Sequence, residues 1–155
     1  MNARRGALFG IGLLGLAALQ AACVKDDPRE TERSDARSLE GVLAADQRLE
    51  TELRKADGLS RTDETKAAEL LETAARPLAE AVVQAATTAP VRSPWGKDRR
   101  VELLRLAEQR RDELTRYAQA LRSPDPKTKL EALQTQIELQ KKLLDAAQRI
   151  TIVPP

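Results

Sequence analysis

The fold is decided by residues 93–150, SPWGKDRRVELLRLAEQRRDELTRYAQALRSPDPKTKLEALQTQIELQKKLLDAAQRI, which contain two helix start signals. Each signal is a short polar residue followed by proline: Ser93 with Pro94, and Asp125 with Pro126. The polar side chain accepts hydrogen bonds from the first free N–H groups of a helix, and proline fits the first helical position because no donor is needed there. The stretch therefore predicts two successive helices.

Apolar residues recur in both predicted helices at intervals of three and four, the period of one helix face. In the first helix the predicted inward-facing residues are Leu103 or Leu104, Ala107, Leu114, Ala118 and Leu121. In the second helix they are Leu130, Leu133, Ile137, Leu144 and Ala147. Each helix thus has an apolar face that must pack on something else.

Two more amphipathic segments precede this stretch. Residues 35–57 predict a helix ended by Gly58, with its inner face formed by Leu39, Val42, Leu49, Leu53 and Ala56. Ser60 or Thr62 is expected to cap the next helix, which runs to Pro90 with its inner face formed by Ala67, Leu71, Ala74, Leu78, Ala81 and Ala85. Pro77 lies inside that helix, where proline costs about 3 kcal/mol, so a kink or break is expected near Arg76.

Four amphipathic segments with short connections predict an all-α fold, a small up-down-up-down four-helix bundle spanning residues 35–153. Charge supports this packing, because residues 35–90 carry 7 basic and 11 acidic side chains, whereas residues 97–150 carry 13 basic and 9 acidic. The alternative architecture is a helical hairpin or coiled coil that completes its core by dimerisation.

Several polar residues occupy positions where the apolar period predicts core. They are Asp46 in the first helix, Arg110 or Arg111 in the third and Gln140 in the fourth. If these side chains meet, they form a buried polar pair that fixes the register of the helices rather than adding stability. The alternative is that local rotation places each of them at the surface.

The segment APVRSPWGK, residues 89–97, contains the only tryptophan of the chain. Tryptophan is enriched at binding hot spots, so Trp95 is a candidate partner contact. The alternative, which we expect, is that Trp95 folds back as a lid over one end of a bundle that lacks other large side chains.

Composition excludes several kinds of site. The chain has no histidine and one cysteine, so the usual zinc, haem and di-iron sites of helical bundles are not expected, and neither is a Ser-His-Asp triad. No paired glycines form a phosphate loop beyond residue 23. We therefore expect no enzyme, no metal and no cofactor.

The first residues have the layout of a secretory signal: Arg4 and Arg5, an apolar run over residues 6–19, and small residues before Cys23. The run is too short for a membrane span. The residues Leu19, Ala21, Ala22 and Cys23 resemble the end of a bacterial lipoprotein signal, although Gln20 occupies the place where the leucine usually stands. The resemblance implies that residues 1–22 are removed and that Cys23 carries the lipid.

After such cleavage the chain keeps 24 of its 26 basic residues against 24 acidic ones, and this zero net charge argues against nucleic acid as a partner. The polar residues 24–34 predict a flexible tether following the lipidated Cys23. In the sorting pattern of enterobacterial lipoproteins an Asp after the cysteine retains a protein on the inner membrane, so Val24 favours the outer membrane, facing the periplasm.

These observations together predict a non-enzymatic cell-envelope lipoprotein whose helical domain binds another envelope protein, as an assembly or pilotin-like accessory factor. The alternative function is a periplasmic carrier or chaperone that holds an apolar ligand between its helices.

Overall fold

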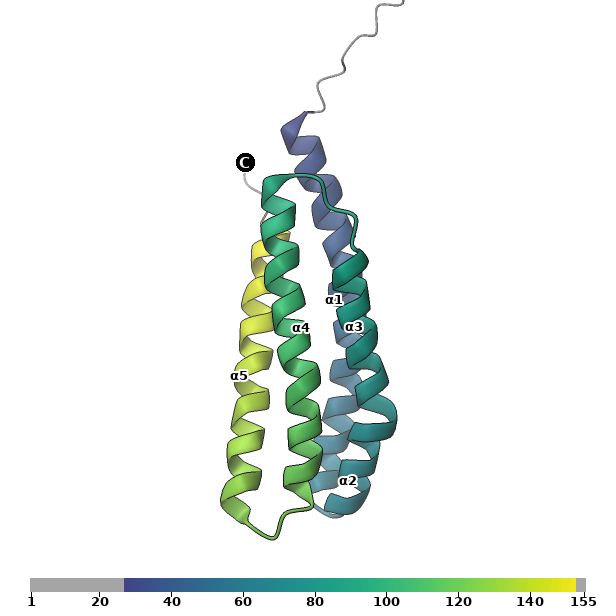
Figure 1. Cartoon of the computed structure of the whole chain (residues 1–155), viewed down its shortest axis with the longest axis vertical. Coiled ribbons are helices and arrows are strands. Elements are labelled where there is room, and N and C mark those ends of the chain that lie inside the picture. The colour runs from purple at the N-terminus through teal and green to yellow at the C-terminus, as the bar shows by residue number, and fades with distance from the viewer. Residues whose placement is uncertain (1–26, 153–155) are drawn as a thin grey trace, which may run out of the picture.

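The computed structural model describes residues 27–152, which form four helical rods connected by short turns (Figure 1). The rods are α1 (Pro28–Ser60), a second rod composed of α2 (Glu64–Leu70), η1 (Leu71–Ala75) and α3 (Arg76–Thr88), then α4 (Pro94–Leu121) and α5 (Pro126–Thr151). Residues 27–152 contain no strand. The prediction of a small all-α, up-down-up-down bundle is confirmed.

Both predicted start signals begin helices. Ser93 Oγ accepts a hydrogen bond from the Gly96 N–H at 2.9 Å, and α4 starts at Pro94. Asp125 accepts from the N–H groups of Lys127 and Thr128 at 3.1 and 3.2 Å, and α5 starts at Pro126. These caps satisfy N–H groups that have no partner within the helix.

The first helix begins earlier than predicted. Asp27 accepts a hydrogen bond from the Arg29 N–H at 3.0 Å, and α1 starts at Pro28, so the prediction of a flexible tether is wrong for residues 28–34. Asp27 and Pro28 are the same start signal as Asp125 and Pro126 of α5. No helix was predicted after them because the residues that follow are polar and show no apolar period. Residues 23–26 lie outside the described residues. Gly58 lies inside α1, which ends at Ser60, and the next helix is capped by Asp63.

The second rod contains one widened turn. In η1 the Arg76 N–H donates to the Leu71 carbonyl, five residues back, so the turn holds one extra residue. Up to Leu71 the predicted inner face is correct, and beyond it every buried position moves by one: Ala75, Ala79, Val82 and Ala86 are buried in place of the four predicted residues. The break expected near Arg76 is therefore a π-helical turn directly before it, and the rod continues through Pro77.

The core lies between the rods and is built mostly of leucine and alanine. In α1 the predicted inner face is confirmed, and in α4 it is confirmed with Leu103, rather than Leu104, as its first residue. In α5 the predicted face is wrong, because the bundle buries Gln136, Leu139, Leu143, Ala146 and Ile150 instead. This helix carries two apolar rows, and periodicity alone does not tell which row turns inward.

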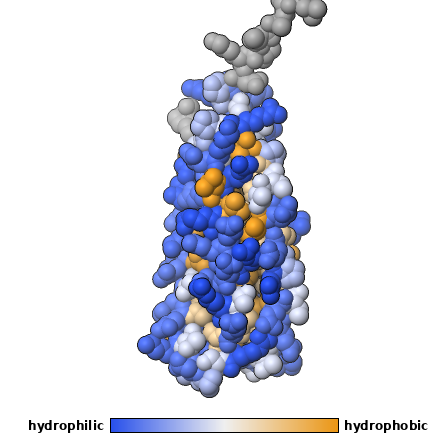
Figure 2. All heavy atoms as spheres, viewed as in Figure 1, coloured by the Kyte–Doolittle hydropathy of each residue, from blue (hydrophilic) through white to orange (hydrophobic). Residues whose placement is uncertain are grey.

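Packing between the rods is uneven. The most extensive contacts join α4 to α5 and to α3, and α1 to the second rod. Among the pairs of rods that touch, α1 and α5 have the fewest contacts. In the view of Figure 2, apolar side chains surface mainly in the upper half of the face, surrounded by hydrophilic ones. Within the described residues, no helix has the length and apolar character needed to cross a bilayer.

Candidate functional site

A groove follows the weakly packed boundary between α1 and α5. In the half nearer the start of α1 it widens into a hollow of about 510 Å³ that is open to solvent. Leu43 of α1 and Leu143, Leu144 and Ala147 of α5 supply its apolar lining. Such concave apolar surface on a small domain is typical of a place where another molecule binds.

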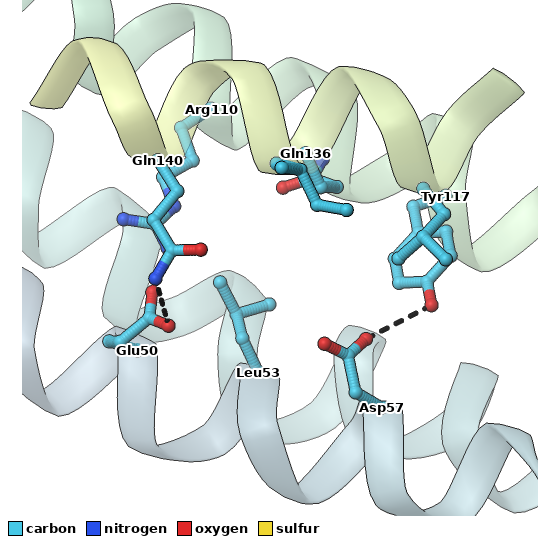
Figure 3. A pocket seen from close by; sticks show the side chains of 9 residues that line it. Glu50, Leu53, Asp57, Arg110, Tyr117, Gln136 and Gln140 are labelled. Atoms are coloured by element: carbon cyan, nitrogen blue, oxygen red, sulfur yellow. Dashed lines mark hydrogen bonds and ion pairs between the residues drawn. The ribbon is translucent and has the colours of Figure 1, made fainter.

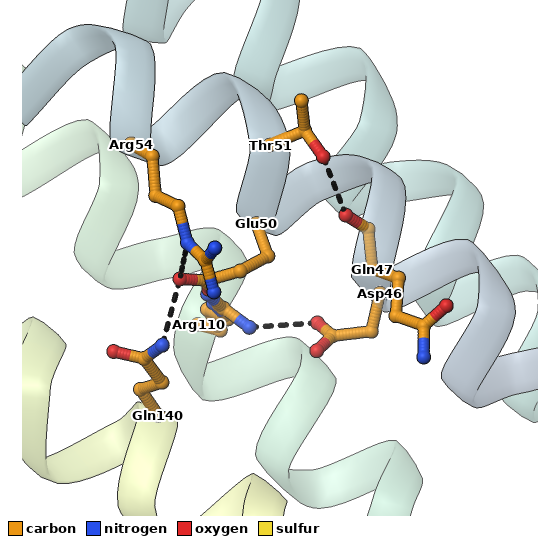
Figure 4. A network of polar contacts seen from close by, with 7 residues as sticks. All are labelled: Asp46, Gln47, Glu50, Thr51, Arg54, Arg110 and Gln140. Atoms are coloured by element: carbon orange, nitrogen blue, oxygen red, sulfur yellow. Dashed lines mark hydrogen bonds and ion pairs between the residues drawn. The ribbon is translucent and has the colours of Figure 1, made fainter.

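A network of polar side chains crosses the middle of the groove (Figure 4). Arg110 of α4 donates through Nη1 to Asp46 Oδ1 at 2.7 Å and through Nη2 to Glu50 Oε2 at 2.5 Å. Gln140 of α5 donates through Nε2 to Glu50 Oε1 at 2.7 Å. The network thus ties α1, α4 and α5 together at one level. Arg110, which supplies its guanidinium, is only 2% exposed.

The structure therefore brings together three of the four residues expected at core positions. Asp46, Arg110 and Gln140 belong to this network, whereas Arg111 points away and pairs with Asp112 at 2.8 Å and with Glu80 at 3.8 Å. One helical step rotates a side chain by about 100°, so only one of two adjacent arginines can face inward.

Sequence reasoning missed Glu50, which joins Gln140 to Arg110. The available signal was its spacing, because Glu50 follows Asp46 by four residues and must lie on the same helix face. Its neighbour Leu49 fills the core position of the apolar pattern, so Glu50 was not counted among the inward-facing residues.

Burial and charge pairing have opposite effects on the carboxylates of this network. Burial raises the pKa of Asp46, and the Arg110 guanidinium opposes this rise by stabilising the carboxylate. Asp46 and Glu50 bring two carboxylates to a single buried guanidinium, with Arg54 Nε at 3.4 Å from Glu50 on the exposed rim. The two carboxylates occupy both Nη groups of Arg110, whereas its buried Nε has no hydrogen-bond partner among the described residues. The network therefore fixes the level at which α1, α4 and α5 meet.

Beyond the network, the groove narrows to a cavity of about 30 Å³ between α1, α4 and α5 (Figure 3). Tyr117 Oη donates to Asp57 Oδ1 at 3.1 Å on its wall. Burial, together with the Asp57 carboxylate, raises the pKa of Tyr117 to about 12. The phenol therefore stays protonated at neutral pH and acts as a donor, not as a base.

Gln136 points into the same cavity from α5. Its side-chain Nε2 and Oε1 are buried without a hydrogen-bond partner among the described residues. The cavity has room for one or two water molecules but not for an organic ligand.

An exposed apolar row borders the groove on α5. Leu130, Ile137 and Leu144 are 56%, 43% and 58% exposed and follow one another at intervals of seven residues. A seven-residue apolar repeat is the pattern of a helix that packs along another helix. These residues were predicted as core, and in the described structure they instead form a surface.

Trp95 lies in the first turn of α4, half-buried and packed against the core. The preceding loop is held on α1 by Asp35, whose carboxylate accepts from the N–H groups of Arg92 and Ser93 at 3.0 and 2.8 Å. Trp95 therefore lies at a fixed end of the bundle and does not line the α1–α5 groove. Cys23 lies outside the described residues.

In the part of the chain that the structure describes, no three acidic or cysteine side chains gather as metal ligands. No family model, no curated protein and no solved structure matches this chain.

Proposed function

We propose that this chain is a membrane-tethered, non-enzymatic interaction domain of the bacterial envelope, an accessory or assembly factor, and that its α1–α5 groove binds an amphipathic helix. The observation that carries the proposal is the exposed row of Leu130, Ile137 and Leu144 beside an open apolar groove.

A helix fits this surface better than a small apolar ligand does. The hollow beside Leu43 and Leu144 is open along the groove, and the exposed row extends it over 14 residues of α5, or about 21 Å. An amphipathic helix presents apolar residues at matching intervals and covers such a groove along its length. A carrier of an apolar ligand would need an enclosed cavity, whereas both the hollow of about 510 Å³ and the narrower cavity of about 30 Å³ are partly open to solvent.

The tether rests on residues 1–23, where Leu19, Ala21, Ala22 and Cys23 resemble a lipoprotein signal. Because α1 begins at Pro28, only residues 24–27 separate Cys23 from the first helix. Four residues span at most about 14 Å, so a lipid on Cys23 holds the domain close to the bilayer. Val24 favours the outer membrane, facing the periplasm.

The tether is tested by replacing its attachment point. Cys23→Ser should move the protein from the membrane pellet to the soluble envelope fraction, because the thiol that accepts the lipid is gone. Mass spectrometry of the amino-terminal peptide should find a diacylglycerol adduct on wild-type Cys23. A wild-type protein that salt alone releases from membranes, or an unmodified amino terminus, contradicts the tether.

The groove is tested by photo-crosslinking in intact cells. A photoreactive residue at Ile137 or Leu144 should give a discrete crosslinked protein band, whereas the same residue at Val101 should not. Val101 is 63% exposed on α4 and does not line the groove, so it controls for collisions with abundant proteins. Equal crosslinking from all three positions contradicts the assignment of the groove.

A further inference from the structure

Gln136 is the one polar residue in the buried row of α5, whose other members are Leu139, Leu143, Ala146 and Ile150. It is 9% exposed, and neither its Nε2 nor its Oε1 has a hydrogen-bond partner among the described residues. A buried amide without a partner lowers the stability of a fold, because its polar atoms lose their bonds to water. A residue that breaks the packing rules in this way is expected at a functional site.

The polar groups around Gln136 are paired with one another and not with its amide. Figure 3 shows Gln136 between two pairs, Glu50 with Gln140 on one side and Asp57 with Tyr117 on the other. Each pair is joined by its own hydrogen bond, of 2.7 Å in the first and 3.1 Å in the second. The Gln136 amide therefore points into the cavity of about 30 Å³ with a donor and an acceptor that the described residues do not use.

This cavity is part of the groove in which we propose that a helix docks. It is partly open to solvent, and Glu50 and Gln140 line both the cavity and the wider hollow. Ile137, the middle residue of the exposed row, also lines the cavity. A short side chain that projects from a docked helix at the level of Ile137 can therefore enter the cavity and reach the Gln136 amide.

Size and charge restrict the group that can enter. A cavity with room for one or two water molecules admits a group as small as a hydroxyl. A carboxylate would face the carboxylates of Glu50 and Asp57, which line the cavity. An ammonium group would face the Arg110 guanidinium and would leave Gln136 Nε2 without an acceptor. A hydroxyl is neutral, and it can accept from Nε2 and donate to Oε1 of the same amide.

We propose that Gln136 determines the specificity of the groove by hydrogen-bonding a serine or threonine hydroxyl that the docked helix inserts into this cavity. This inference rests on the proposed function, in that it takes the α1–α5 groove as the docking surface of an amphipathic helix. It adds the chemical group that the helix must carry.

The exposed row indicates where the hydroxyl lies on the partner helix. Leu130 and Leu144 are seven residues before and after Ile137, or about 10 Å along α5 in each direction. The partner helix therefore has the hydroxyl in the middle of its apolar face and apolar residues about seven positions away on both sides. A helix with a fully apolar face would cover the Gln136 amide without pairing it and is disfavoured for that reason.

The test uses two synthetic peptides that differ in one residue. Both are amphipathic helices with leucines seven positions before and after a central residue, which is serine in one peptide and alanine in the other. Fluorescence anisotropy measures the binding of each labelled peptide to the lipid-free chain with Cys23→Ser. We expect this chain to bind the serine peptide at least about tenfold more tightly, because the alanine peptide leaves the buried Gln136 amide unpaired.

Variants of Gln136 test whether its amide causes this preference. Gln136→Leu should lose the preference for the serine peptide, and so should Gln136→Met, which keeps the length of the side chain without its polar atoms. Gln134→Leu, on the exposed side of the same helix, is the matched control and should keep the preference. Thermal unfolding verifies that every variant is folded. A purely structural role of Gln136 would change stability without changing the ratio of the two peptide affinities.

The outcomes separate this inference from the proposed function. Equal binding of both peptides, weakened by Leu144→Gln, overturns the hydroxyl site and leaves the groove as a helix-binding surface. A serine preference that Gln136→Leu retains also overturns the inference, because another residue must then recognise the hydroxyl. Binding of neither peptide overturns it as well, and the crosslinks from Ile137 and Leu144 in cells then decide whether the groove itself is a docking surface.

Discussion

Asp35 and Gly96 are packed so closely that a Cβ atom at position 96 would lie 2.2 Å from Asp35 Oδ2 and 2.8 Å from Asp35 Cβ. The Asp35 carboxylate is held in place, because it accepts hydrogen bonds from two backbone N–H groups and from Ser93 Oγ at 2.7 Å. The start of α4 therefore rests directly on α1, and the register between these helices is fixed at this point.

We expect Gly96→Ala to lower the free energy of unfolding by about 1–3 kcal/mol, because the added methyl group must displace Asp35 from its donors. Urea unfolding followed by circular dichroism measures the change. Gly41→Ala is the matched control, since a Cβ at Gly41 meets nothing within 4 Å. In that exposed helical position alanine should raise stability by up to about 1 kcal/mol. Equal effects at both positions would contradict the Asp35 contact.

Arg110→Met should be strongly destabilising, because it leaves Asp46 and Glu50 without the guanidinium that neutralises them. Removing one member of a buried ion pair costs about 3–5 kcal/mol, and the partly exposed carboxylates favour the lower end of that range. Arg111→Met changes the same side chain one step along the helix and should shift stability by about 0.5 kcal/mol or less. The urea unfolding midpoints of the two variants measure this difference in stability. Similar losses of stability in both would show that the network does not position the helices.

Features of this fold could be predicted from the sequence where neighbouring residues encode them. The caps at Ser93 and Asp125 are encoded in two adjacent residues, and both helix starts were predicted from them. The inner faces of α1 and α4 follow a single dominant apolar row. The meeting of Asp46, Arg110 and Gln140 was one of two open alternatives, because register between helices depends on how they pack rather than on either sequence alone.

The remaining differences between the predicted and the observed helices have physical causes that the helical period of 3.6 residues does not reveal. The π-helical turn at Leu71–Ala75 adds one residue and shifts the rest of the buried face. In α5 two apolar rows compete, and the choice is made by contact with α4, which is not visible in α5. The first turns of α1 are mostly exposed, so their polar composition resembles that of a flexible tether.

Gln136→Leu should raise stability by about 1 kcal/mol, because the buried amide has no protein partner and a leucine removes the cost of desolvating it. Gln134→Leu, on the exposed side of the same helix, serves as the control and should be near neutral. Thermal unfolding of both variants measures the difference. A clear loss of stability in Gln136→Leu would show that the amide is hydrogen-bonded, for which water in the adjoining cavity is the available partner.

Trp95 reports on the end of the bundle through its fluorescence, as the only tryptophan of the chain. Because it is half-buried against the core, we expect emission between that of a buried and a fully exposed indole, shifting to the red in urea. Trp95→Phe should cost less than Trp95→Ala, for which we expect a loss of about 1–3 kcal/mol, below the 3–5 kcal/mol of a fully buried aromatic. Fully red emission with unchanged melting of Trp95→Ala would contradict the lid and make this end a second contact surface.

Tyr117 provides the last prediction, because it is the only tyrosine and its ionisation can be read directly from ultraviolet absorbance. Burial and the Asp57 carboxylate raise its pKa from 10.0 to about 12, so the native protein should titrate near 12 and the urea-unfolded chain near 10. Between these values the unfolded chain releases a proton that the folded one keeps. Stability from this group is therefore fully present below pH 10 and is lost as pH rises toward 12. The expected loss is on the order of 1–3 kcal/mol, because one pKa unit corresponds to about 1.4 kcal/mol. In Tyr117→Phe this part of the alkaline loss should vanish, whereas a native titration midpoint near 10 would show that the Tyr117–Asp57 contact does not form.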